Sequence, residues 1–598
     1  MGLPWLDSPL MLHSSGEHIC NLTAAQCEYE SDHWRDGSQA DHVYGYATIC
    51  FMCAVIGVYS LAHWGSIFTH RWSFYRSRVW LRIRAMNRYL SCKLFYIKLL
   101  DWCSPSLGVM ILGAVGLIFF FSLSLGPGTY YWPGGPNSLF GDSVPLSFRS
   151  AFIALGILPF IPALASKINY ITLLTGVSHQ KLQVFHRWTS WAMFVLALMH
   201  TFPLVVSHIQ KGDITTQWKT KVQWWTGVAT LVPQAWLSIM SIGPIRNTLF
   251  GNDSVCVLPL HTLQFSTFFL VSSVGPSISS FGLLNRDYLI AALSVYLSTV
   301  LYSMIKTFFL TRLHYATVSV LPGNTISLHL PTAKFRWSPA QHVFLRLLHP
   351  TLRLHILTSH PFTICSLPSK DSKQSIMTFC IRPSASHSSL TSRLARLASA
   401  TSVPVLIDGP YGDSGIVSKL NMFEKRIFVA GGSGIGFLLP ILQGLRRQDE
   451  LSIIVVLKDR LSAEWVRDSI EDVLEVGSKD VLVQIYVTGG SMSVNDATSS
   501  DPESELEKDG IPSDTDWEYK DKAEEKRGDV RIIERRGRPD LKEIVRGECE
   551  DSMRIGVVAC GPRSLMGDVK EACAGEQWGI LRRGVDKEVW FHGEDFSW

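Results

Sequence analysis

Residues 186–200 read HRWTSWAMFVLALMH, an apolar stretch with a histidine at each end. On an α-helix, a turn of about 100° per residue puts His186 and His200 on one face, within about 40° of each other. A rise of about 1.5 Å per residue separates them by about 21 Å along the axis, which places one near each side of a hydrocarbon core about 30 Å thick. Polar groups at such depth are costly unless they have partners. Two interfacial histidines with ordinary hydrogen bonds are one interpretation, but the pair on one face favours two haem-iron ligands, one for each leaflet.

A haem held by two histidines needs a ligand from a second helix. The apolar segment near 259–280 supplies His261. If both helices run in the same direction, His186 and His261 lie near the same end and could bind one haem. A partner for His200 would lie about fourteen residues beyond His261 by the same helical spacing, where the sequence has Val274 and Gly275 instead.

The first half of the chain is membrane-like and the second half is not. Apolar residues make up 47% of the 598 residues and charged residues 18%, but the chain is apolar up to about residue 310 and charged throughout afterwards. The net charge of +4 is too small to predict a nucleic-acid partner. A helix needs about 20 apolar residues to span a bilayer. Segments of that kind lie near 44–64, 106–126, 150–166, 184–206, 223–243, 259–280 and 288–310.

Basic residues orient these predicted spans. The loop after the first span is rich in Lys and Arg, whereas the loop 127–148 has none. The N-terminus is therefore expected outside and the C-terminal half in the cytosol. Glycosylation at the sequon Asn21-Leu22-Thr23 and a Cys20–Cys27 disulfide are then expectations for the outer side. The loop 207–222, expected outside, is an exception because it carries three lysines, Lys211, Lys219 and Lys221.

The second half reads as a soluble α/β protein. Short alternating segments such as HYATVSVLPGNTISLHL predict antiparallel strands, and RIFVAGGSGIGFLLPILQGL predicts a strand, a glycine-rich turn and a helix of an open parallel sheet. Glycines there let a backbone approach a phosphate at a helix N-terminus. VVACGP (557–562) predicts a second strand end at the ligand-binding edge of that sheet; a buried structural role is the alternative for Cys560. The polar stretch 491–535 predicts a disordered surface insertion.

Taken in order, the motifs resemble the fungal ferric reductase family, relatives of the NADPH oxidases. The resemblance rests on RSAFIALGILPFIPALASKINYITLLTGVSHQKLQVFHRWTSWAMFVLALMH, FRWSPAQHVFLRL, SHPFTICSLP, DGPYG, AGGSGIGFLLPIL, ACGPRSLMGDV and the terminal EDFSW. It implies a multi-domain membrane protein with an α-helical transmembrane haem domain, an antiparallel β-barrel that binds FAD and an α/β parallel-sheet domain that binds NADPH. The expected domains are an outer segment 1–43, two spans with a basic cytosolic loop at 44–148, the haem domain 149–310, the barrel 311–420 and the NADPH domain 421–598.

The resemblance also implies residue roles. Haem b, one or two per chain, would be bound by His186, His200 and His261. FAD would be bound by His360, Pro361, Phe362 and Thr363. NADPH would be bound by Gly431, Gly432, Ser433, Gly434, Ile435 and Gly436, with Cys560, Gly561 and Pro562 beside the nicotinamide. Phe596 or Trp598 would stack near the flavin, and with Cys560 these are the expected catalytic residues.

The implied function is a ferric-chelate reductase in the plasma membrane or the vacuolar membrane. Electrons would pass from cytosolic NADPH through FAD and haem to external ferric chelates or siderophores, for iron uptake. A superoxide-producing oxidase on the same scaffold is one alternative. The Ser-rich stretch around His261 departs from the family's pattern, so a sequence artefact in that stretch, a lost outer haem and a non-catalytic membrane homologue are others.

Overall fold

The computed structural model describes residues 23–25, 37–69, 77–97, 102–126, 144–242, 245, 280–307, 313–332, 335–369, 374–384, 389–397, 402–445, 450–474, 481–489, 522–527, 530–584 and 586–595. Contacts divide the chain into two compact units. The helical unit comprises Met1–Trp72 and Met110–Ile305, and the sheet unit comprises Ser73–Val109 and Lys306–Trp598.

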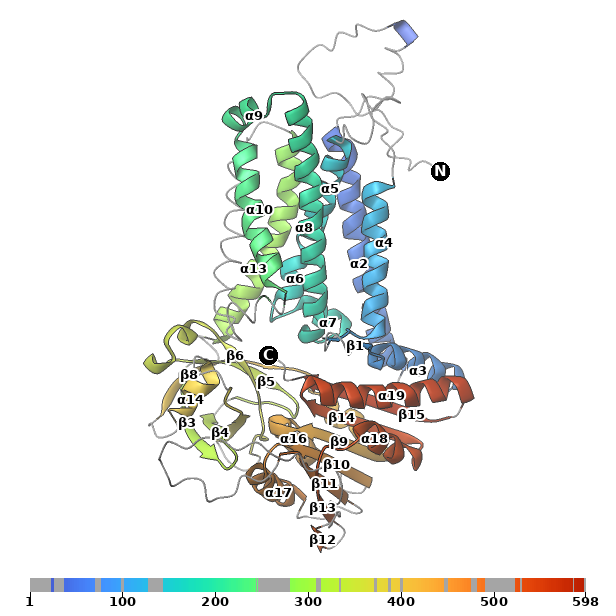
Figure 1. Cartoon of the computed structure of the whole chain (residues 1–598), viewed down its shortest axis with the longest axis vertical. Helices are drawn as coiled ribbons and strands as arrows, with labels where there is room; N and C mark the ends of the chain where they lie inside the picture. The colour runs from blue at the N-terminus through green and yellow to red at the C-terminus, as the bar shows by residue number, and fades with distance from the viewer. Residues whose placement is uncertain are drawn as a thin grey trace, which may run out of the picture. The chain divides into compact units, whose positions relative to one another are not determined.

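The helical unit is built from long apolar helices (Figure 1). Within the described residues, five segments are long and apolar enough to cross a membrane: His42–Phe68, Leu107–Leu125, Leu146–Ala165, Lys181–Gln210 and Asp287–Ile305. They confirm five of the seven predicted spans. The predicted span 223–243 is helical but is not among these five, and 259–280 lies outside the described residues. The helices are α2 (Gly37–Thr69), α4 (Leu107–Leu125), α5 (Val144–Ile157), α6 (Phe160–Ala165), α7 (Tyr170–Thr175), α8 (His179–Gln210), α9 (Ile214–Thr220), α10 (Val222–Met240) and α13 (Ser280–Ile305).

Helix α5 packs against both α2 and α8. The backbones of α2 and α5 approach each other closely. A Cβ added to Gly156 would stand 2.8 Å from the carbonyl oxygen of Gly45, so only glycine fits where the two helices meet. Small residues allow this approach in membrane helices. The buried Arg149 has two contacts inside the same bundle: its Nη1 donates to the Ser124 carbonyl oxygen at 3.1 Å, and its guanidinium lies 4.8 Å from the ring centre of Tyr44.

The first part of the sheet unit is an antiparallel barrel. Its strands follow the order β6-β5-β8-β3-β4-β7. The backbone N–H of Cys365, just after β6, donates to the Thr378 carbonyl oxygen on β7 at 2.7 Å, which brings the two edge strands together. The strands are β3 (Leu313–Leu321), β4 (Thr325–Thr332), β5 (His342–Leu347), β6 (His360–Thr363), β7 (Ser375–Ile381) and β8 (Val403–Tyr411).

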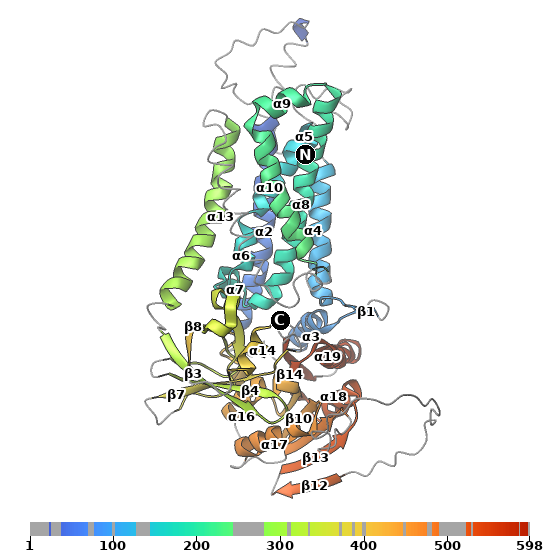
Figure 2. The same cartoon turned by 60° about the vertical axis from the view of Figure 1, so that its left-hand side comes forward.

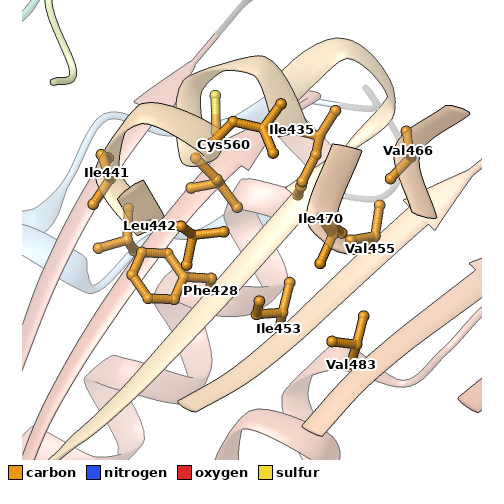
Figure 3. Close-up of a cluster of buried hydrophobic side chains, with 14 of the residues drawn as sticks. Phe428, Ile435, Ile441, Leu442, Ile453, Val455, Val466, Ile470, Val483 and Cys560 are labelled. Carbon is orange, nitrogen blue, oxygen red and sulfur yellow. The ribbon is translucent and has the colours of Figure 1, made fainter. Parts of the chain in front are cut away.

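The second part is a mainly parallel seven-stranded sheet with the order β12-β13-β11-β10-β9-β14-β15. The strands β9, β10 and β14 are buried along nearly their whole length, as expected for parallel strands covered on both faces. Figure 3 shows part of this core, where Phe428, Ile453 and Val483 from neighbouring strands pack together. The elements are β9 (Lys425–Gly431), α16 (Ile435–Gly444), β10 (Glu450–Leu457), α17 (Arg460–Leu474), β11 (Val481–Val487), β12 (Lys522–Arg527), β13 (Val530–Arg536), α18 (Leu541–Glu550), β14 (Arg554–Gly561), α19 (Arg563–Arg583) and β15 (Glu588–Asp595).

The predicted disordered insertion 491–535 is wrong at its C-terminal end. Lys522–Arg527 forms β12, and Val530–Arg536 forms β13, which pairs parallel with β11. Strand β13 has the sequence VRIIERR, and its Ile532 is buried against the sheet. Residues 490–521 lie outside the described part of the chain.

The basic loop after the first span contains a helix that belongs to the sheet unit. This helix, α3 (Arg78–Cys92), lies beside α19, as Figures 1 and 2 show. Its Ala85 and Cys92 are buried in the same cluster as side chains of α18 and α19. A two-strand hairpin, β1 (Tyr96–Ile97) and β2 (Trp102–Cys103), follows it and leads to α4.

Candidate functional site

The glycine-rich turn joins β9 to α16. Gly432 has φ +57°, a left-handed conformation that favours glycine. A Cβ on Gly434 would stand 2.3 Å from the Cys560 carbonyl oxygen, so a side chain there cannot be accommodated without moving backbone. The turn therefore keeps bare backbone at the N-terminus of α16, which is where a phosphate group binds best.

The second predicted nucleotide segment lies directly beside this turn. Strand β14 pairs parallel with β9, with Cys560 opposite Ala430. A Cβ on Gly431 would stand 2.7 Å from Pro562 Cδ. Strand β9 has β10 as its neighbour on one side and β14 on the other. The strand order therefore reverses between β9 and β14. Ligands of open α/β sheets bind at such a switch point.

The Cys560 side chain itself is fully buried. It packs in the hydrophobic cluster that contains Ile435 and Phe428, as Figure 3 shows. The carbonyl oxygen of Cys560 approaches Gly434 of the glycine turn. A role for Cys560 beside the nicotinamide stays a prediction.

The predicted flavin segment is strand β6 of the barrel. His360 pairs with Leu345, Thr363 pairs with His342, and the His360 Nε2 lies 2.8 Å from the Thr358 hydroxyl. Immediately afterwards, Cys365 reaches the glycine turn, since a Cβ on Gly436 would stand 2.5 Å from its Sγ. The structure thus brings together the HPFT strand, the glycine turn and the end of β14, although up to 200 residues separate them in the chain.

Arg382 is a candidate that the sequence analysis missed. It follows β7, is exposed, and its Nη1 lies 3.6 Å from where a Cβ on Gly432 would stand. A guanidinium at this distance from a glycine turn can bind a pyrophosphate of either nucleotide. The only sequence signal is an arginine after a strand, so the fold is needed to show that it faces Gly432.

A polar cluster lies beside Thr363, the residue that pairs with His342. The Tyr411 hydroxyl donates to Asp408 Oδ1, and Lys306 Nζ lies 4.8 Å from the Tyr411 ring centre. The His342 ring lies 6.1 Å from the same tyrosine ring. Burial lowers the pKa of His342, with Glu594 of β15 acting in the opposite direction. Burial therefore favours the neutral form of His342, which lies near Glu594 of β15.

The membrane histidines are both on α8, and each is oriented by a neighbouring helix. His186 Nδ1 lies 3.1 Å from the Ile161 carbonyl oxygen, and His200 Nδ1 lies 3.0 Å from the Ser147 carbonyl oxygen. A carbonyl oxygen only accepts, so these two contacts fit imidazoles that carry their proton on Nδ1 and present Nε2 as the nitrogen with a lone pair. Histidines that bind metals are oriented in this way, so the residues present fit a haem.

The remaining predicted site residues lie outside the described part of the chain. These are His261 on the sixth predicted span, and Phe596 and Trp598 at the C-terminus. Cys20, Cys27 and Asn21 lie outside it as well. Among the described residues, no group of three or more His, Cys, Asp and Glu side chains forms a metal site.

Three family models match the chain in sequence order. They are the ferric reductase like transmembrane component at residues 150–272, the FAD-binding domain at 310–415 and the ferric reductase NAD binding domain at 423–574. The first match includes the three predicted haem ligands, the second includes the HPFT strand, and the third includes the glycine turn and Cys560.

The chain is similar to curated proteins that are named as ferric or ferric/cupric reductases. The probable cell surface ferric reductase kap2 of Aspergillus oryzae is 26% identical over 67% of this chain and 52% of its own length. The ferric/cupric reductase transmembrane component 7 of Saccharomyces cerevisiae is 26% identical over 66% of this chain and 63% of its own length. Component 1 of Candida albicans is 25% identical over 71% and 54%. The chain thus spans between about half and two thirds of the length of these relatives.

Proposed function

Because the chain belongs to the ferric reductase family of membrane proteins, we propose that it transfers electrons from cytosolic NADPH, through FAD and haem b, to ferric chelates or siderophores outside the membrane. This proposal rests on one observation: β6, whose sequence is HPFT, lies together with the glycine turn and the end of β14 in the sheet unit. The two oriented imidazoles of α8 support the haem part of the proposal.

The roles of the chain's own residues follow from their positions. When bound, FAD accepts a hydride and releases electrons one at a time, and haem iron carries single electrons. The N-terminus of α16, with Gly432 and Arg382, would hold a pyrophosphate. His186 and His200 would ligate iron through Nε2, with His261 as the partner ligand on the sixth span. One or two haems per chain fit these residues.

A preference for NADPH over NADH is supported by the residues that follow β10. In dinucleotide-binding sheets, an acidic residue there binds the free ribose hydroxyls of NADH, whereas a basic residue accommodates the 2′-phosphate of NADPH. Here Lys458 and Arg460 are exposed, while Asp459 accepts the Ser462 backbone N–H at 2.7 Å. The net charge of these three residues is positive, which favours binding of the 2′-phosphate.

One experiment tests the proposal and separates it from its alternatives. The full chain is purified into nanodiscs, its haem and flavin are quantified, and NADPH oxidation is followed with either a ferric chelate or oxygen as the acceptor. We expect haem b and FAD, a higher rate with NADPH than with NADH, and ferric reduction faster than superoxide production. A preparation without a haem band would overturn the proposal in favour of a non-catalytic homologue, and preferred superoxide production would overturn it in favour of an oxidase.

A further inference from the structure

Helix α3 has two different faces. On the first, Arg84 Nη1 and Arg88 Nη2 both bond Glu588 Oε1, at 2.7 Å and 2.8 Å, and Arg88 Nη1 also donates to the Val589 carbonyl oxygen at 3.0 Å. Ala85 is 3% exposed on the same side. This face binds α3 to β15 and α19 of the nucleotide-binding sheet.

The opposite face is apolar and uncovered. Val79, Ile83 and Met86 are 64%, 51% and 46% exposed. At about 100° per residue these three side chains lie within an arc of about 60°, roughly opposite the face that carries Arg84, Ala85 and Arg88. An amphipathic helix normally buries its apolar stripe, so this stripe indicates a partner other than the sheet unit.

The end of α3 is fixed to the start of a membrane span. The backbone N–H of Leu107, the first residue of α4, donates to the Lys93 carbonyl oxygen at 2.8 Å. Leu90, on the same side of α3 as the apolar stripe, packs with its Cβ 3.4 Å from where a Cβ on Gly108 would stand. Because α4 is apolar from its first residue, with a mean hydropathy of 2.3, these contacts hold the end of α3 at the boundary of the hydrocarbon region.

The residues around the stripe have the chemistry of a lipid interface. Arg82, beside the stripe, is exposed. Phe95 and Tyr96, between α3 and α4, are 45% and 57% exposed. Aromatic side chains gather at the level of lipid headgroups, and arginines near the cytosolic surface attract anionic lipids.

We propose that α3 lies in the headgroup layer of the cytosolic leaflet and binds the nucleotide-binding sheet to the membrane surface. Val79, Ile83 and Met86 enter the acyl boundary, Arg82 binds anionic headgroups, and Arg84 and Arg88 hold Glu588 on the other side. The partner is the lipid bilayer itself, because the helix is fixed to one span at its C-terminal end and follows another after the short segment 70–77.

Photo-crosslinking of the full chain in nanodiscs tests this proposal. p-Benzoylphenylalanine replaces Ile83 in one variant and Ile376 in the control, because Ile376 is also an isoleucine of the sheet unit and is 53% exposed. In discs of phosphatidylcholine and phosphatidylserine, we expect light-dependent phospholipid adducts by mass spectrometry at position 83 and none at position 376. Equal adducts at both positions, or a peptide adduct without lipid at position 83, would overturn the proposal.

A second comparison tests the role of charge. The adduct yield at position 83 should fall severalfold when phosphatidylserine is omitted, and Arg82→Glu should lower it to a similar extent. Yields that do not respond to either change would overturn anionic headgroup binding. These readouts require no electron transfer, so they succeed or fail independently of the proposed reductase activity.

Discussion

At the scale of single residues, the two imidazoles of α8 show how a sequence pattern becomes a site. Their spacing could be recognised in the sequence because it follows from helix geometry alone. The carbonyl oxygens of Ile161 and Ser147 that orient them could not, because those residues come from other helices and the pairing depends on tertiary packing. Arg382 was missed for the same reason.

His186→Ala should remove haem and ferric reduction while leaving NADPH-dependent flavin reduction in place. Loss of one iron ligand affects only the steps beyond the flavin. Haem per chain from absorbance spectra, and flavin bleaching under anaerobic NADPH, are the two measurements. The control is His208→Ala on the same helix, since His208 Nδ1 bonds Asp213 Oδ1 at 2.8 Å instead. Equal haem content in both variants would contradict the assignment of His186.

Gly434→Ala should weaken NADPH binding without removing haem. The new methyl group would meet the Cys560 carbonyl oxygen, and displacing backbone at this turn should cost about 1–3 kcal/mol, which corresponds to an increase of about 5- to 150-fold in KM for NADPH. Steady-state kinetics give the KM. Gly567→Ala in α19 is the matched control, because nothing lies within 4 Å of its added Cβ. An unchanged KM in Gly434→Ala would remove the glycine turn from the nucleotide site.

The stability of the protein should fall as pH drops below the ordinary His pKa. Burial lowers the pKa of His342 from 6.5, against the opposing effect of Glu594. The unfolded chain then binds a proton below pH 6.5 that the folded protein does not, so this contribution is present above 6.5 and is lost as pH falls toward the folded pKa. His342→Gln should flatten the decline of the unfolding midpoint below pH 6.5. Tryptophan fluorescence melts at several pH values measure it, and identical slopes would exclude His342 as the cause.

At the scale of elements, the least expected finding is the place of α3. The sequence predicts a basic cytosolic loop there, and its positive charge is indeed present. Two of its arginines are used by Glu588, which lies about 500 residues later in the chain. A pairing of that range leaves no local signal, so the partner of this helix could not be predicted. The strands β12 and β13 were missed for a related reason: their charged composition is typical of a loop, and sheet pairing overrides it.

Glu588→Ala should destabilise the sheet unit strongly. It leaves Arg84 and Arg88, which are only 14% and 20% exposed, without their carboxylate, a change that typically costs about 3–5 kcal/mol for a buried pair. A drop of several degrees in the melting temperature of the detergent-solubilised chain is expected. Asp586→Ala is the control, because its ion pair with Arg78 is largely exposed and should contribute less than about 1 kcal/mol. Equal effects of the two substitutions would show that Glu588 does not hold α3.

At the scale of the whole molecule, the order of parts could be predicted and their contacts could not. The change from apolar to charged sequence near residue 310 marks where the membrane helices end, and the strand–turn–helix pattern after residue 425 predicts the parallel sheet. Both rest on local periodicity. The meeting of Cys365, Gly436 and Cys560 depends on how two domains pack, which periodicity does not encode.

The direction of the chain through the membrane gives a prediction at the same scale. Ser166 Oγ lies 3.2 Å from Thr299 Oγ1, so the end of α13 lies beside the segment that precedes α8. Helix α8 has 32 residues and is therefore about 48 Å long. Lys211 follows its C-terminal end, which is the end opposite this contact. An impermeant amine reagent on intact cells should therefore modify Lys211, Lys219 and Lys221. Lys419 and Lys542 of the sheet unit should react only after permeabilisation, and early labelling of these two would reverse the proposed orientation.

The pairing of α3 with Glu588 also constrains how the protein is made. A ribosome adds about 5–20 residues per second, so Arg88 is synthesised about 25–100 s before the glutamate that will neutralise it, 500 residues later. During that interval the nascent helix carries two unneutralised arginines beside a membrane into which its neighbours are being inserted. Strand β15 completes this interface, so a product that stops before residue 588 would leave α3 without its carboxylate partner.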